Sequence, residues 1–184
     1  MTTHKASAKY YIATIVFFAT IAGLLFGFDT GVISGSLQFI SQTFGITASH
    51  YQLKEFIVSA VPFGALIGAI LSKKSSFILG RRRSIITTAI MFIIGTGMVV
   101  VAHDVTMVLV GRVIMGMAVG LSAMIVPMYL SEISPPRVRG AVVFCFQLAI
   151  TLGLLMAFIV NFAFADGNWR AMFAVGLVPS VLLW

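Results

Sequence analysis

The segment LLFGFDTGVISG, residues 24–35, places a single carboxylate in the middle of an apolar stretch. Asp29 follows a run that contains no Lys, Arg, Asp or Glu and begins at Tyr10. A helix needs roughly 20 mostly apolar residues to cross a bilayer, so this run predicts a membrane span. A charged acid at the centre of a span costs about 2.5–3.5 kcal/mol on insertion scales. We therefore expect Asp29 to face a watery cavity or a charged partner, and not lipid.

The rest of the chain has the same apolar character. Of its 184 residues, 60% are hydrophobic and 9% are charged, and the mean hydropathy is +1.09. Soluble domains carry about 25% charged residues. Six stretches are long and apolar enough to span a membrane, at approximately 11–36, 53–72, 84–102, 106–129, 141–164 and 169–184. The sequence thus predicts an all-α membrane protein of six transmembrane helices with almost no soluble domain.

The basic residues are distributed unevenly between the two sides of the predicted bundle. With a cytoplasmic N-terminus, the outer segments hold only Lys54 and Arg170, and Arg112 lies inside a span. The inner segments hold the others: Lys5, Lys9, Lys73, Lys74, Arg81, Arg82, Arg83, Arg137 and Arg139. Cytoplasmic loops of membrane proteins carry such an excess. The net charge of +7 therefore indicates topology and contact with the lipid bilayer, and nucleic acid is not expected as a partner.

Residues for metal or catalytic chemistry are sparse. The lone Cys145 excludes an internal disulfide. The three histidines (His4, His50 and His103) fall in the tail or the outer loops without metal-ligand spacing, so no metal site is expected. The sequence has no nucleophile–base arrangement, phosphate loop or pair of catalytic carboxylates. Neither an enzyme nor a cofactor is predicted.

Arg112 is the natural partner of Asp29, because it is the only basic residue inside a span and lies at a matching depth. Asp29 lies about seven residues from the outer end of its helix and Arg112 about six from the outer end of its own. At roughly 1.5 Å per residue, both lie about 10 Å below the outer surface. The two helices also open the two three-helix halves, which inverted repeats would place symmetrically with a site between them.

Small residues at intervals of about one helical turn predict where the helices touch. Asp29 is two residues from Gly27 and from Gly31, so it points about 200° away from that stripe. We expect Phe26, Thr30 and Ile33 on its face. The stripes are Gly23, Gly27, Gly31 and Gly35 in 11–36; Ala60, Gly64, Gly68 and Ser72 in 53–72; and Gly111, Gly116 and Gly120 in 106–129.

Several motifs resemble those of the sugar porters in the major facilitator superfamily. GFDTGVISG at 27–35 looks like the first-helix motif of that family. The segment IMGMAVGLSAMIVPMYLSEISPPRVR, from Ile114 to Arg139, matches its second signature in two glycines, an aromatic residue, an acid and a base. GR at 111–112, RGA at 139–141, FQLAITLG at 146–153 and NWRAMF at 168–173 are also similar to the family.

The resemblance implies a twelve-helix fold of which residues 1–184 form the N-terminal six-helix half, built from 3+3 inverted repeats. The C-terminal half would be absent, and the sixth helix would be cut at Trp184. A missing half, or a partner chain that replaces it, is then expected. The face with Asp29, Arg112 and Gln147 is expected to lie uncovered without that partner.

The resemblance also implies roles for individual residues. Asp29 matches the protonation site of proton-coupled members, and Arg112 the arginine that pairs with it. Phe26 matches an aromatic residue that packs on the sugar ring, and Gln147 a glutamine that hydrogen-bonds sugar hydroxyls. A cytoplasmic charge cluster that latches the two halves is matched by Arg81, Arg82, Glu132 and Arg139.

One segment departs from the family pattern. The loop between the second and third helices usually reads G-x-x-x-D/N-R-x-G-R-R, and here it is GAILSKKSSFILGRRR at 68–83. Lys73 and Lys74 replace the acid and its arginine, and about four residues are extra. The departure is consistent with an atypical gene and with a divergent loop that still works.

The implied activity is sugar–proton symport by alternating access, with sugar and proton as substrates, in the bacterial inner membrane. A facilitative sugar uniporter is one alternative, although facilitators of this family commonly have Asn at the position of Asp29. A transport-inactive sensor or interaction subunit is another, and a truncated reading frame without function is a third. The sequence does not identify the sugar.

Overall fold

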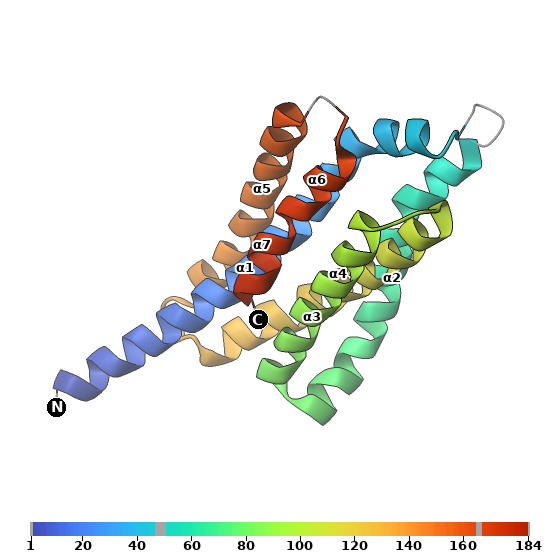
Figure 1. Ribbon diagram of the computed structural model, residues 1–184. Coiled ribbons are helices and arrows are strands. Elements are labelled where there is room, and N and C mark those ends of the chain that lie inside the picture. The colour runs from blue at the N-terminus through green and yellow to red at the C-terminus, as the bar shows by residue number, and fades with distance from the viewer. Residues whose placement is uncertain (1, 47–50, 165–166, 184) are drawn as a thin grey trace.

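The computed structural model describes residues 2–46, 51–164 and 167–183, and these form helices joined by short connections (Figure 1). The helices are α1 (Thr2–Thr43), α2 (Tyr51–Leu79), α3 (Arg81–Val100), α4 (Val105–Ile133), α5 (Arg139–Ala163), α6 (Trp169–Val175) and α7 (Leu177–Leu183). The predicted all-α fold is confirmed.

Five of the helices in the described ranges are long and apolar enough to cross a membrane. Each overlaps one of the first five predicted spans along nearly its whole length. The sixth predicted span is divided at Gly176 into α6 and α7, and its apolar part in the described chain runs over Trp169–Leu182. This last segment is shorter than the other five.

Helices α1 and α4 lie at the centre of the bundle. In the most apolar window of each, 61% of the residues are buried, against 33% in α2 and 22% in α5. Helix α5 packs along α1, and α2 packs along α4 (Figure 1). Helices α3, α6 and α7 complete the bundle through contacts of α3 with α4 and of α6 and α7 with α1 and α3. The two central helices are the ones that carry Asp29 and Arg112.

Glycines set how closely the central and flanking helices approach. A Cβ atom added to Gly27 of α1 would lie 1.8 Å from the Ile150 carbonyl oxygen of α5. One added to Gly120 of α4 would lie 2.0 Å from the Ala65 carbonyl oxygen of α2. Backbones this close leave no room for a side chain. The small-residue contacts predicted from the sequence are thus confirmed for both pairs of helices.

The connection between α2 and α3 differs from the prediction. Helix α2 does not end near residue 72 but continues through Lys73 and Lys74 to Leu79. Lysine and serine do not break a helix, which explains the extension. Gly80, with φ 79°, makes the turn to α3, and the hydroxyl groups of Ser75 and Ser84 are hydrogen-bonded across it at 3.0 Å. A positive φ favours glycine.

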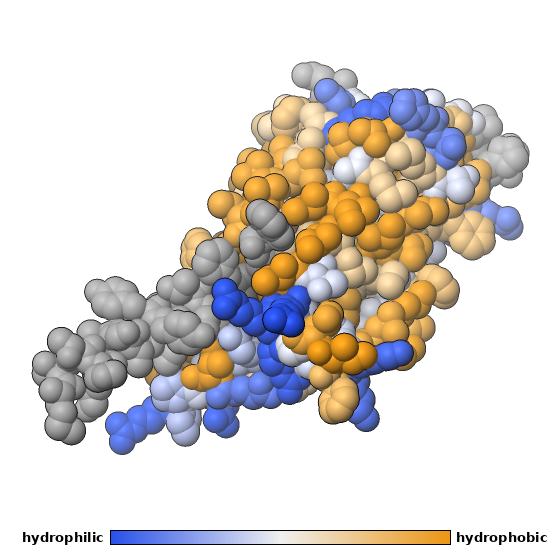
Figure 2. All heavy atoms as spheres, turned by 60° about the horizontal axis from the view of Figure 1, so that its bottom comes forward, coloured by the Kyte–Doolittle hydropathy of each residue, from blue (hydrophilic) through white to orange (hydrophobic). Residues whose placement is uncertain are grey.

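Polar residues gather at the two ends of the bundle, and the surface between them is mainly apolar (Figure 2). One end carries the α2–α3 and α4–α5 connections, and we call it the basic end. Its exposed cations are Lys73, Lys74, Arg82, Arg83, Arg137 and Arg139. The distribution suits a protein that spans a bilayer.

Candidate functional site

Asp29 and Arg112 form an ion pair inside the bundle. The Arg112 Nη1 donates a hydrogen bond of 2.7 Å to the Asp29 Oδ1. Asp29 is 2% exposed and Arg112 1% exposed. The two residues are 83 positions apart in the chain, so the pair exists only in the folded bundle. The predicted contact is confirmed. The matching depths are not, because α1 continues beyond residue 36 to Thr43, so Asp29 lies farther from the end of its helix than Arg112 lies from the start of α4 at Val105.

The neighbours of Arg112 explain why its side chain points to α1. Gly111 lies against Gly95 of α3, and Gly116 lies against Val61 of α2. Helix α4 therefore uses its glycines for α2 and α3, and the face with Arg112 is left for α1. The guanidinium also lies 5.7 Å from the centre of the Phe173 ring of α6. A cation within about 6 Å of an aromatic face is attracted to it.

The ion pair is incompletely hydrogen-bonded. Both the Asp29 Oδ2 and the Arg112 Nε are buried and have no hydrogen-bond partner in the structure. A bidentate pair of arginine and carboxylate would be joined by two parallel hydrogen bonds. This pair uses one. Among the described residues, the Asp29 Oδ2 thus has no hydrogen-bond donor.

Phe26 and Gln147 meet in a separate pocket of about 470 Å³ between α1, α4 and α5. Gln147 is exposed and Phe26 is half-buried. The pocket is lined by Phe26, Ala123, Pro127, Gly140, Val143, Phe144, Phe146, Gln147 and Ile150. A largely apolar wall with a few polar groups, in a volume of roughly 300–1,000 Å³, is typical of small-molecule sites. The two predicted substrate-binding residues therefore share one surface.

Asp29 does not line that pocket, which corrects two expectations. Thr30 was expected on the face of Asp29, but it is exposed and its hydroxyl donates to the Phe26 carbonyl at 2.9 Å. Asp29 and Arg112 were expected on an uncovered face with Gln147, yet both are enclosed by the bundle itself. The reason is that α3, α4, α6 and α7 already pack on this side of α1.

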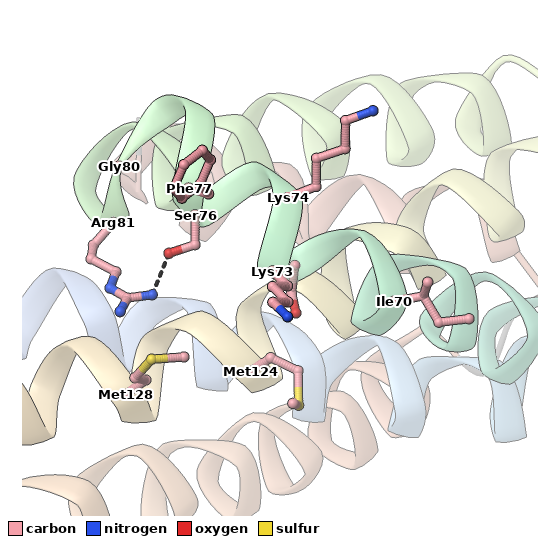
Figure 3. A pocket seen from close by; sticks show the side chains of 10 residues that line it. Ile70, Lys73, Lys74, Ser76, Phe77, Gly80, Arg81, Met124 and Met128 are labelled. Atoms are coloured by element: carbon pink, nitrogen blue, oxygen red, sulfur yellow. Dashed lines mark hydrogen bonds between the residues drawn. The ribbon is translucent and has the colours of Figure 1, made fainter.

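The predicted charge cluster at the basic end is only partly assembled. Arg81 donates to both carboxylate oxygens of Glu132, at 2.8 Å and 3.2 Å. It also donates to the Ser76 hydroxyl (Figure 3). Arg82 and Arg139 are exposed, and within the described residues neither forms an ion pair. The Arg81–Glu132 pair fastens the start of α3 to the end of α4.

A pocket of about 860 Å³ lies beside this pair, between α2 and α4. Lys73, Met124 and Met128 point toward the same space, whereas Lys74 points away from it (Figure 3). Phe77 is 91% exposed. Both lysines that distinguish this chain from the family pattern border this open pocket, and only the side chain of Lys73 points into it.

The sequence did not predict a place in this site for two residues, Phe173 and Thr96. Phe173 was noted only as part of NWRAMF, and its position over Arg112 depends on how α6 packs. Thr96, a buried residue of α3, lines a small cavity next to Asp29. Only a helical-face analysis of the span 84–102 gives a signal for it, because Thr96 lies on the same face as the buried Phe92.

Comparison with known proteins identifies the family. The sequence profile of the family described as "Sugar (and other) transporter" matches residues 15–184. The chain belongs to this family. The galactose-proton symporter of Escherichia coli (strain K12) is 44% identical over 170 residues, which make up 92% of this chain and 36% of that protein. The arabinose-proton symporter of the same strain is 44% identical over 166 residues, 90% of this chain and 34% of that protein.

The fold comparison agrees with the family assignment. The partially occluded inward open structure of the xylose transporter XylE from E. coli superposes with a TM-score of 0.86 at 32% sequence identity. The match covers 94% of this chain and 48% of the XylE chain. The helices therefore have the arrangement of the N-terminal half of the major facilitator fold. The chain spans about a third of the length of the curated relatives named above, at 36% and 34%.

Proposed function

We propose that this family member takes part in sugar–proton symport, with Asp29 as the proton acceptor and Arg112 as its counter-charge. The enclosed ion pair of 2.7 Å is the observation that supports this most directly. Ionisable residues inside membrane spans are rare and usually mark transport pathways or proton relays. Protonation of Asp29 would remove the attraction to Arg112 and let α1 and α4 move relative to one another.

The pocket with Phe26 and Gln147 would hold part of the sugar. An aromatic ring suits the apolar face of a monosaccharide, and a carboxamide both donates and accepts hydrogen bonds to hydroxyl groups. The relatives named for galactose, arabinose and xylose support a monosaccharide as the substrate class. Because Phe26 and Asp29 are three residues apart on α1, movement of that helix would couple the two sites. This transport role uses no catalytic chemistry, so we propose no enzymatic activity.

The open side of the sugar pocket requires a cover. In alternating access, the substrate site lies between two halves that rock about it. We propose that a second six-helix half, on the same polypeptide or on a partner chain, covers two pockets. One is the pocket of Phe26 and Gln147, and the other is the pocket between α2 and α4 that Lys73 points into. The latch at the basic end would involve Arg81, Arg82, Glu132 and Arg139, of which Arg81 and Glu132 are already paired. The membrane would be the bacterial inner membrane, with the basic end in the cytoplasm.

Sugar-dependent proton uptake tests the proposal. The complete product of the gene, with any sequence that flanks these residues, is produced in a bacterium lacking its own symporters for galactose, arabinose and xylose. Addition of the transported sugar to a weakly buffered suspension of cells should make the medium more alkaline. Asp29→Asn should abolish this alkalinisation and leave exchange of labelled sugar across the membrane intact. Glu55→Gln, which changes an exposed acid of α2, is the matched control.

Two results would contradict the proposal. Proton uptake that survives in the Asp29→Asn protein would remove Asp29 from the coupling step and leave facilitated transport. Absence of movement or binding of any of the three sugars in the unmodified protein would remove the transport role itself.

A further inference from the structure

A small cavity of about 10 Å³ lies against Asp29 and has no lining residue in common with the pocket of Phe26 and Gln147. Its walls come from α1, α3, α4, α6 and the turn before α7, and Arg112 is not among them. The lining residues are Leu25, Phe28, Asp29, Val32, Phe92, Thr96, Met115, Phe173 and Gly176. Asp29 and Thr96 are the two polar side chains in this set. The cavity has room for about one water molecule.

Both polar side chains of the cavity have unused hydrogen-bonding capacity. The Asp29 Oδ2 is buried and accepts no hydrogen bond. Thr96 is 3% exposed, and within the described residues its hydroxyl makes no hydrogen bond either. A buried polar group without a partner costs about 1–3 kcal/mol, and more when it is charged. An acceptor and a donor thus border the same space.

The other hydroxyl side chains of α3 show that Thr96 is different. Ser84, Thr87 and Thr88 donate to carbonyl oxygens of the preceding helical turn, at 2.9, 3.0 and 2.6 Å. This is the usual arrangement for Ser and Thr inside a helix. Thr96 does not use it, so its proton is available to a group outside α3.

We propose that this cavity is a binding site for one water molecule that joins the Thr96 hydroxyl to the Asp29 Oδ2. The water would supply the hydrogen bond that Arg112 does not give to the carboxylate. Thr96 would then be a positioning residue for the proton acceptor. Arg112 is the one charged side chain that faces Asp29 from the described parts of α3, α4, α5, α6 and α7, since Arg170 of α6 bonds the Ala102 carbonyl. The inference rests on the proposed role of Asp29 but concerns its solvation.

Infrared difference spectroscopy of the chain in liposomes tests the water site. The chain has five acidic residues, so subtraction of the Asp29→Asn spectrum isolates the bands of Asp29. In Thr96→Val, these bands should shift because a hydrogen bond to the carboxyl group is lost. An O–H stretching band that moves in H₂¹⁸O should disappear in both Thr96→Val and Asp29→Asn. Thr96→Ser, which keeps the hydroxyl, should retain both signals.

Thr88→Val is the matched control, because Thr88 is buried on the same helix and bonds its own backbone. The amide bands of each variant report whether the helices are intact. If the valine variant is not helical, Thr96→Ala removes the hydroxyl without adding volume and replaces it in the test.

Two outcomes would overturn the inference, and both differ from failure of symport. Asp29 bands that are the same in Thr96→Val and the unmodified chain would separate Thr96 from the carboxyl group. A shift without an ¹⁸O-sensitive band would mean direct contact of the two side chains and no water site. Because Asp29 has either a protonated or an ionised band at any pH, the test is readable even where Asp29→Asn leaves proton uptake unchanged.

Discussion

The Asp29–Arg112 pair combines two charges that would each be costly alone. The pair is enclosed at 2% and 1% exposure, and one hydrogen bond of 2.7 Å joins its members. Removal of one partner from a buried ion pair costs about 3–5 kcal/mol because the other charge is left uncompensated, whereas removal of both is often tolerated. Protonation of Asp29 should therefore change the stability of the bundle more than protonation of a surface acid would.

We expect Arg112→Met to destabilise the chain by about 3–5 kcal/mol, because it leaves Asp29 buried without its counter-charge. The double variant Asp29→Asn, Arg112→Met should recover most of that loss. Unfolding of the detergent-solubilised proteins, followed by Trp fluorescence against denaturant, measures both. Arg83→Met removes an exposed cation of α3 and is the control. If Arg112→Met unfolds like Arg83→Met, the pair does not stabilise the bundle.

Contact between helix backbones holds α1 in the orientation that presents Asp29 to α4. The Leu24 carbonyl oxygen of α1 would lie 2.1 Å from a Cβ atom added to Gly153 of α5, and Gly27 makes the reciprocal approach to Ile150. This contact occupies the face of α1 opposite Asp29. The packing of α1 on α5 thus determines that Asp29 lies on the side of α1 that faces α4.

Gly27→Ala should separate α1 from α5, because its Cβ atom would lie 1.8 Å from a backbone oxygen. Added atoms in a packed interior cost about 1–3 kcal/mol. Gly97→Ala is the matched control, since Gly97 lies inside α3 and an added Cβ atom meets nothing within 4 Å there. Thermal unfolding midpoints in detergent should fall for Gly27→Ala and stay level or rise for Gly97→Ala. Equal midpoints would argue against a close α1–α5 contact.

The sequence predicted those features that depend on hydropathy and helical geometry. The spans, the glycine contacts and the pairing of Asp29 with Arg112 follow from the number of residues per turn and the cost of charge in lipid. The end of α2 was predicted too early, because Lys73 and Lys74 are polar but compatible with a helix. The separation of Asp29 from the pocket of Phe26 was not predictable, since it depends on how α3, α6 and α7 pack against α1.

Apolar side chains are exposed unevenly over the molecule, and many of them lie on α2 and α5. On α2 and α5, large apolar side chains are exposed along much of the helix length, among them Phe63, Ile70 and Phe77 on α2 and Phe144 and Phe162 on α5. Contiguous apolar surface of this kind meets lipid or another protein. Because the pocket of Phe26 and Gln147 opens between α1, α4 and α5, we expect part of this surface to face the cover proposed above and part to face the bilayer.

The basic end also determines the orientation that we expect in the membrane. Cytoplasmic segments are enriched in Lys and Arg, so Lys74 should lie inside the cell and His103, at the opposite end, outside. Single cysteines introduced as Lys74→Cys and His103→Cys, in a Cys145→Ser background, report the sides. A maleimide that does not cross membranes should label only the His103→Cys protein in intact cells and both proteins after the membranes are opened. The background without cysteine should stay unlabelled. Labelling of Lys74→Cys from outside intact cells would reverse the orientation, and protons would then reach Asp29 first from the cytoplasm.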